Sequence, residues 1–411
     1  MPCFSARLII VLVLALAVVG LDSVFAQEQQ SNQTSENWWS ATIDAQLQQA
    51  ADNRAEILKS LQTIKPEHRP ALSFLIEHMP TADLQSLTSE FLLENIRLSY
   101  QVKEQMPWGD AIPEHIFFND VLPYANVDET RENWRLEMMD RCLPIVKQCQ
   151  TPGEAAQKLN RELFSLINVK YSRKRKRANQ SPSESIELSR ASCTGLSIIL
   201  SDACRSVGVP ARLVGTPSWT KKQGNHTWVE IWDQGWKFTG AAEPADQLNK
   251  GWFKNDASHA LDDDPRHRIY AVSYAKTGMY FPMVWAPRNQ QVPGVNVTPR
   301  YITDRETLPV DQSRVLISIF DAKGNRLVRQ VSVVPHLDDD EPTEDSTADQ
   351  AQPLWTGQTR GPEADTNDIL SIQLKRNQQF QITWTEDGTE QLFIRSTADQ
   401  EQTWWRFQLE E

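Results

Sequence analysis

The pattern of hydrophobic and polar residues divides the chain into a helical part, a mixed part and a strand-rich part. From about residue 38 to 166, apolar residues recur at helical spacing, as at Leu87, Phe91, Leu92 and Ile96, which stand at i, i+4, i+5 and i+9. This spacing places apolar side chains on one face of a helix. We therefore predict a helical N-terminal region over residues 38–150.

Residues 151–300 combine helical and strand patterns. Thr151-Pro152 predicts a helix start, because threonine caps free N–H groups and proline suits the first helical position. A second helix is predicted at about 193–207, after the potential N-cap Ser192 and before Gly208. Alternating residues predict strands at 211–215, 226–232 and 236–240.

Beyond residue 305 the pattern changes to short alternating runs, which are typical of antiparallel strands. Residues 337–367 are acidic and poor in apolar groups, so we expect an acidic disordered loop there. We predict that residues 305–411 form an antiparallel β domain resembling a sandwich. Its predicted strands are 315–320, 327–334, 369–374, 379–385, 391–396 and 403–409.

The first 26 residues have the pattern of a signal peptide. Arg7 precedes an apolar run over residues 8–20, and Ala26 is a small residue at the expected cleavage position. The run is short for a membrane span, although an uncleaved anchor is the alternative. We expect cleavage, no membrane span afterwards and a periplasmic or secreted protein. The Gln/Ser/Asn-rich residues 27–37 are expected to be disordered.

Composition and charge exclude few classes of function. The net charge of −12 argues against nucleic-acid binding over the whole surface. The basic run Arg173–Arg177 is a local exception, read as a solvated loop, with steering of acidic substrates or a processing site as alternatives. No cysteine or histidine has companions at zinc spacing, so we predict no metal site and no cofactor. Cys142 and Cys149 lie roughly 10 Å apart along a continuous helix, which is too far for a direct disulfide.

The candidate chemistry lies at Cys193 and His226. Cys193 falls in the first turn of its predicted helix, where unpaired N–H groups and the helix dipole favour a thiolate. His226 begins a predicted strand and offers a base. A cysteine at a helix start and a histidine on a strand are the basic arrangement of a cysteine hydrolase.

Seven short segments of the chain carry a recognisable combination of residues, in the order 180–182, 192–197, 205–212, 225–230, Trp236, 240–244 and 251–253. Together they resemble the transglutaminase-like superfamily, in its bacterial exported branch. The resemblance implies an α+β, papain-like core in which the cysteine helix packs on an antiparallel sheet that carries histidine and an acid. Members include crosslinking acyltransferases, peptidases and peptide-N-glycanases, so the fold leaves the reaction open.

The chain departs from the family pattern at Gly240, where the common pattern has aspartate. A two-residue hairpin turn would place Glu243 directly opposite His226, so we predict Glu243 as the acid that orients the imidazole. A three-residue turn would place Ala242 there instead. Glu230 lies roughly 13 Å along the strand from His226, which is too far for this role.

These observations predict an exported cysteine enzyme that acts on amide bonds of proteins or peptides. Cys193 is the expected nucleophile, His226 the base, Glu243 the third residue and Gln180 a candidate oxyanion donor. We favour hydrolysis by a peptidase or amidase over amine transfer. The alternative is an inactive transglutaminase-like protein that serves as a binding or scaffold protein. The sequence leaves the substrate, the role of the β domain and the oligomeric state open.

Overall fold

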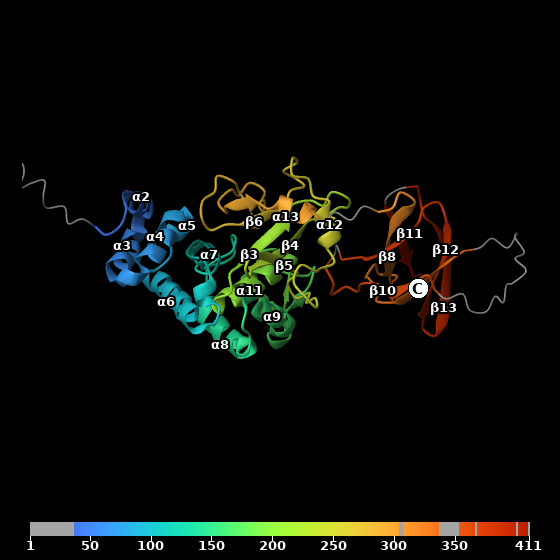
Figure 1. The fold of residues 1–411 in the computed structure, drawn as a ribbon, viewed down its shortest axis with the longest axis horizontal. Coiled ribbons are helices and arrows are strands. Elements are labelled where there is room, and N and C mark those ends of the chain that lie inside the picture. The colour runs from blue at the N-terminus through green and yellow to red at the C-terminus, as the bar shows by residue number, and fades with distance from the viewer. Residues whose placement is uncertain (1–36, 304–307, 337–352, 366–367, 400–401, 410–411) are drawn as a thin grey trace, which may run out of the picture.

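The computed structural model describes residues 37–303, 308–336, 353–365, 368–399 and 402–409. Figure 1 shows a helical part, a mixed core and a β domain following one another along the long axis of the molecule. This is the α+β architecture predicted from the sequence. The expected signal peptide, most of the segment 27–37 and residues 337–352 lie outside the described residues.

The helical N-terminal part has its own hydrophobic core, formed by residues such as Leu72, Ile76 and Ile96. Within the described residues, no helix is both long enough and apolar enough to cross a membrane. The helices of the N-terminal part are α2 (Ala41–Gln49), α3 (Arg54–Thr63), α4 (Arg69–His78), α5 (Thr81–Leu84), α6 (Ser89–Gln105), α7 (Glu114–Asp120) and α8 (Trp134–Val146), with 3-10 turns at Ala51–Asn53, Pro66–His68 and Gly109–Ala111.

The mixed core packs helices against an antiparallel sheet whose strand order is β5-β4-β3-β6-β7. A short parallel pair, β1 and β2, lies beside it. The helices are α9 (Pro152–Leu166), α10 (Pro182–Leu188), α11 (Cys193–Ser206), α12 (Lys254–Ser258) and α13 (Thr298–Ile302). The strands are β1 (Lys170–Tyr171), β2 (Arg190–Ala191), β3 (Ala211–Thr216), β4 (His226–Trp232), β5 (Trp236–Thr239), β6 (Tyr270–Val272) and β7 (Gly294–Asn296).

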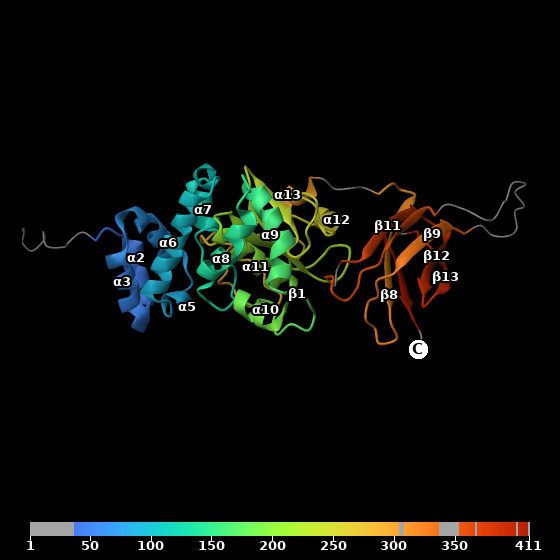
Figure 2. The same cartoon turned by 90° about the horizontal axis from the view of Figure 1, so that it is seen from below.

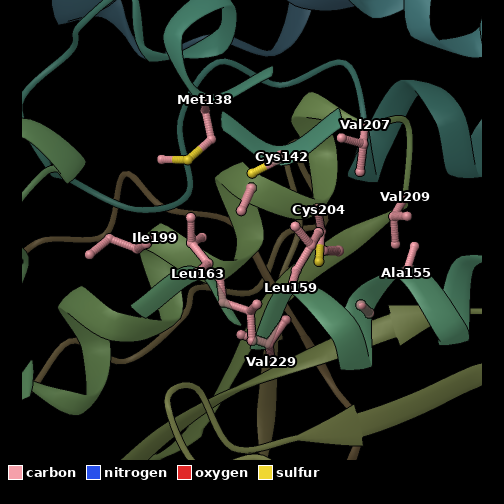
Figure 3. Close-up of a cluster of buried hydrophobic side chains, with 14 of the residues drawn as sticks. Met138, Cys142, Ala155, Leu159, Leu163, Ile199, Cys204, Val207, Val209 and Val229 are labelled. Atoms are coloured by element: carbon pink, nitrogen blue, oxygen red, sulfur yellow. The ribbon is translucent and has the colours of Figure 1, made fainter. Parts of the chain in front are cut away.

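Helix α11 is the central element of this core. Figure 3 shows Ile199 and Cys204 of α11 among side chains from α8, α9 and β4. All its residues after Cys193 are buried, so the helix is held on several sides. Cys204 is fully buried, and Cys142, Cys149, Cys193 and Cys204 are all free thiols.

Two buried arginines fix α11 to the helical part. The Arg205 guanidinium donates to the carbonyl oxygens of Asp120, Ala125 and Ala211. Arg135 of α8 in turn donates to the carbonyl oxygen of Arg205 at 3.1 Å. These bonds join α11 to α8, to the segment after α7 and to the start of β3, so the network makes the position of α11 specific.

The C-terminal domain is a sandwich of two described sheets, with strand orders β11-β8-β14 and β10-β9-β12-β13. Trp384, Trp405 and Phe407 lie in its core. The pairing is antiparallel except between β8 and β14, which are parallel. The strands are β8 (Gln312–Phe320), β9 (Gln330–Pro335), β10 (Trp355–Gln358), β11 (Leu370–Lys375), β12 (Gln379–Glu386), β13 (Thr389–Ser396) and β14 (Gln402–Gln408).

Strand β10 lies inside segment 337–367, which we expected to be one disordered loop. Residues 353–365 are ordered because strand β10 pairs with β9 and the residues after it bond to the connection between β8 and β9. Thr359, for example, donates through its Oγ1 to the carbonyl oxygen of Leu327 at 2.7 Å. Figures 1 and 2 show this part of the chain reaching from the β domain toward the core.

Candidate active site

Cys193 is the first residue of α11, as the sequence predicted. The N-cap Ser192 accepts a hydrogen bond from the backbone N–H of Gly195 at 3.0 Å, and its hydroxyl donates to the carbonyl oxygen of Ala178. The cap therefore sets where the helix begins and ties that point to the preceding loop. Cys193 itself is half-buried.

His226 is the first residue of β4, the neighbour of α11. Two hydrogen bonds join the elements beside it: Thr194 Oγ1 donates to Thr227 Oγ1 at 3.1 Å, and Ser197 Oγ donates to the carbonyl oxygen of Thr227 at 3.2 Å. Since Thr194 and Thr227 each follow a candidate residue in the chain, these bonds bring Cys193 and His226 together.

Aromatic rings surround the imidazole of His226. The nearest ring centroids are those of Trp252 at 4.7 Å and Phe253 at 5.0 Å, followed by Trp228 at 5.8 Å and Trp219 at 6.2 Å. Among the described residues, neither ring nitrogen has a hydrogen-bond partner. The cage thus restricts the ring while leaving both nitrogens available for proton transfer.

A carboxylate from the β domain completes the cluster. Asp365 Oδ2 lies 3.7 Å from His226 Nδ1, and both side chains are only 2% exposed. The potential ligand atoms of Cys193, His226 and Asp365 all lie within 4.8 Å of one another. The sequence analysis missed Asp365, because its segment was read as disordered and lies well over a hundred residues from His226 along the chain.

Arg326 fixes the loop that carries Asp365. This arginine, from the connection between β8 and β9, donates to the carbonyl oxygens of Ala364 at 2.6 Å, Asp365 at 2.9 Å and Asp368 at 2.8 Å. Three hydrogen bonds from one guanidinium thus hold the backbone on both sides of the Asp365 side chain. The position of the carboxylate therefore depends on the folded β domain.

The hairpin register differs from the one that pointed to Glu243. Trp232 pairs with Trp236, so the loop has three residues rather than two. Glu243 instead accepts a hydrogen bond from Trp252 Nε1 at 2.8 Å. Its carboxylate takes up the space beside Gly240, where a Cβ would lie 2.4 Å from Glu243 Oε2.

The charge state expected of Glu243 also differs. Burial, and next the charge of Asp365, raise the pKa of Glu243 well above its ordinary value. Both effects favour the neutral carboxyl group over the carboxylate. Glu243 makes no hydrogen bond to His226, and of the two acids it is Asp365 that lies at ion-pair distance from the imidazole.

Gln180 is fully buried, and its side-chain amide forms hydrogen bonds to the basic loop, to α10 and to β2. Its Oε1 accepts from the backbone N–H of Lys176 at 2.9 Å, and its Nε2 donates to the carbonyl oxygen of Arg190 at 3.0 Å and to Ser185 Oγ at 3.4 Å. Both amide hydrogens have acceptors there. These contacts give Gln180 a structural role, in place of the oxyanion role expected from the sequence.

The resting thiol is neutral, contrary to the expectation from its helix position. Burial raises the pKa of Cys193 to about 12, and the charge of Asp365 adds to this effect. The backbone N–H groups of Thr227 and Thr194 lower the pKa by less. Desolvation and a nearby carboxylate therefore outweigh the helix terminus.

A groove of about 460 Å³ gives access to the thiol. Its lining includes Cys193, Asp365, Trp285 and the basic residues Arg173 and Arg175. The thiol, imidazole and carboxylate are also ligand types for a single zinc ion. The arrangement is suited to nucleophilic attack by sulfur with proton transfer to His226.

Residues 140–257 match the family model of the transglutaminase-like superfamily. The match confirms the resemblance noted in the sequence. The matched range contains Cys193, His226 and Glu243 and ends before Asp365. No curated protein sequence matches the chain.

Three solved structures have low similarity to the chain. A candidate cysteine protease from Cytophaga hutchinsonii is 14% identical, with a TM-score of 0.24 and coverage of 28% of this chain and 40% of that chain. A candidate protease from Parabacteroides distasonis is 10% identical, with a TM-score of 0.24 and coverage of 49% and 34%. Red sea bream transglutaminase is 8% identical, with a TM-score of 0.27 and coverage of 71% and 65%. The chain thus spans between 34% and 65% of the length of these structures.

Proposed function

We propose that the transglutaminase-like core is a cysteine-dependent hydrolase that cleaves amide bonds of proteins or peptides. One observation carries the proposal: a cysteine at a helix start, a histidine in an aromatic cage and a carboxylate lie with their reactive atoms within 4.8 Å. The family match supports a cysteine enzyme and leaves its substrate open.

In the proposed reaction, His226 removes the thiol proton as Cys193 attacks the amide carbonyl. This order follows from a pKa of about 12 for the resting thiol, which makes a preformed thiolate rare at pH 7. The amine leaves with the proton from the imidazolium, and a thioester to Cys193 remains. Water, deprotonated by His226, then attacks the thioester and releases the acid.

Two further groups support the charges that develop. Asp365 is the proposed positioning residue, since a carboxylate beside Nδ1 favours the imidazolium. The backbone N–H of Cys193 belongs to the first helical turn, where amides have no intrahelical acceptor, and it is the proposed donor to the oxyanion.

We further propose that the enzyme acts outside the cytoplasm, after removal of residues 1–26. The charged start, short apolar run and Ala26 support export. Sequencing the N-terminus of protein from its native compartment should give Gln27 first. An intact N-terminus recovered with membranes would show an anchor.

The test of activity uses the full chain and a diverse peptide mixture, with new termini read by mass spectrometry. A labelled alkylamine in the same reaction reports amine transfer, and a chelator reports metal dependence. Cys193→Ala should abolish cleavage, whereas Cys204→Ala, in the same helix but away from the site, should retain it. Cleavage that survives Cys193→Ala, or that the chelator stops, contradicts the proposal.

A binding or scaffold protein without catalysis is the second candidate function. Gly240 in place of the family's aspartate and the raised pKa of Cys193 favour it. It predicts no new termini and no amine incorporation with the peptide mixture. It also predicts no covalent capture of substrate peptides by the parent protein.

A further inference from the structure

A second and larger cavity, of about 1010 Å³, lies between the core and the β domain. One wall comes from the core around β1, β2 and the start of the basic loop. The other comes from the outer face of β8 and β14 and from the loop before β11. Its lining includes Tyr171, Phe320, Trp404 and the cations Lys170, Arg173, Lys174, Arg190, Arg326 and Arg406.

Positive charge dominates this cavity. Its one lining acid, Glu363, pairs with Lys170 at 3.2 Å. Within the part of the chain that the structure describes, Arg173, Lys174 and Arg406 form no ion pair with a carboxylate. In a protein with a net charge of −12, such a concentration of cations favours an anionic ligand.

Neutral groups hold Arg190 and Arg406 in this cavity. Arg190 donates to the carbonyl oxygens of Leu188 and Lys174, and Arg406 lies 4.2 Å over the ring of Phe320. Backbone carbonyls and rings orient these guanidinium groups without neutralising them. Their positive charge is therefore available to a ligand.

The cavity shares part of its lining with the groove at the thiol. Tyr171 and Arg173 line both, and Arg175 lines the groove. Asp365 faces His226 within this groove, so its charge is directed to the imidazole. A chain that enters between the two domains is thus led past basic side chains to Cys193.

We propose that this cleft, from β14 to the basic loop, binds an acidic segment of a polypeptide substrate beside the amide that is cleaved. The inference rests on the proposed function for its link to cleavage, while binding itself is testable without it. A polypeptide is favoured over other polyanions because the cleft leads to a nucleophile suited to amides. Trp404, which is 51% exposed, adds apolar surface for neighbouring side chains of a peptide.

The binding experiment uses the full chain with Cys193→Ala, so that no turnover occurs. The probes are a fluorescein-labelled peptide with a block of glutamates and the same peptide with glutamines. Fluorescence anisotropy should show affinity at least about tenfold higher for the glutamate peptide, decreasing as salt is raised. Arg173→Glu with Lys174→Glu should abolish the difference between the peptides. The matched control reverses two exposed lysines of the helical part, Lys59 and Lys65, and should change little.

The outcomes separate this inference from the proposed function. Equal affinity for both peptides, or unchanged binding after charge reversal at Arg173 and Lys174, contradicts binding of an acidic segment in the cleft. Tight binding of an anionic polysaccharide without binding of the glutamate peptide also overturns it. If the glutamate peptide binds but the parent protein cleaves no peptide, the cleft stands and the hydrolase fails. If the parent cleaves peptides without any preference for acidic flanks, the hydrolase stands and the cleft fails.

Discussion

Replacing Asp365 by asparagine tests whether the β domain supplies the positioning residue of the site. The change keeps the shape of the side chain and removes its charge. With an effective dielectric constant of about 20, a carboxylate 3.7 Å from an imidazolium contributes about 4.5 kcal/mol of attraction. The same carboxylate within 4.8 Å of a thiolate contributes at least about 3.5 kcal/mol of repulsion.

The two charges therefore act in opposite directions in two reactions. Amide cleavage needs the imidazolium, while in the proposed reaction the negative charge moves from sulfur to the carbonyl oxygen beside the backbone N–H of Cys193. We expect about 3 kcal/mol of net loss, which is about a 100-fold lower kcat. Alkylation of Cys193 needs only the thiolate, so Asp365→Asn should lower the pKa of the thiol and should not slow alkylation.

The assay compares cleavage of the best peptide with iodoacetamide labelling of Cys193 from neutral to alkaline pH. Asp399→Asn, the same change at an exposed position of the β domain, is the matched control and should leave both rates near those of the parent. Thermal melting of each variant separates a charge effect from unfolding. The reasoning is refuted if cleavage is unchanged, or if cleavage and alkylation fall together without loss of stability.

Three further changes test the surroundings of the site. Burial raises the pKa of Glu243 above its usual 4.5, so its contribution to stability is full below that pH and is lost as the pH rises toward the raised pKa. Glu243→Gln should then gain melting temperature over the parent as the pH rises from about 5 to 9, and a constant difference contradicts this. Gly240→Ala places a Cβ 2.4 Å from Glu243 Oε2 and should cost about 1–3 kcal/mol in denaturant unfolding, with a smaller cost when Glu243 is also alanine. Arg326→Ala removes three hydrogen bonds to the loop of Asp365, so we expect a lower kcat and faster proteolysis of this loop while the β-sheets stay folded. If the loop resists proteolysis as in the parent and kcat is unchanged, Arg326 does not hold the loop in place.

Local sequence patterns determined most of the secondary structure. The helix starts after Thr151 and Ser192 are where threonine or serine caps predicted them, because a cap depends on residues within one turn. The strands of the β domain agree with their alternating runs within a few residues, since alternation directly reports two faces of a sheet. Cys193 and His226 were found for the same reason, each lying at the end of a predictable element.

The register of the hairpin and the place of Gln180 needed the fold. Two- and three-residue turns are both compatible with Asp233-Gln234-Gly235, and packing of the strands chose the longer one. The side-chain amide of Gln180 can form four hydrogen bonds, and its Nε2 group donates to Ser185 Oγ and to the carbonyl oxygen of Arg190. No local pattern ranks such partners.

Only the tertiary structure brought the acid to the histidine. Asp365 lies in an acidic segment whose composition reads as disordered, and neighbours in sequence do not distinguish it from Asp368. Arg326 clamps its loop and the aromatic cage holds His226 beside it, although these groups come from separate domains. The charge state of Cys193 also depends on the tertiary structure. The helix start lowers the pKa of the thiol through groups within one turn, which the sequence reveals. Burial and the carboxylate of a distant loop raise this pKa and outweigh the helix start, because little water remains to screen the charges.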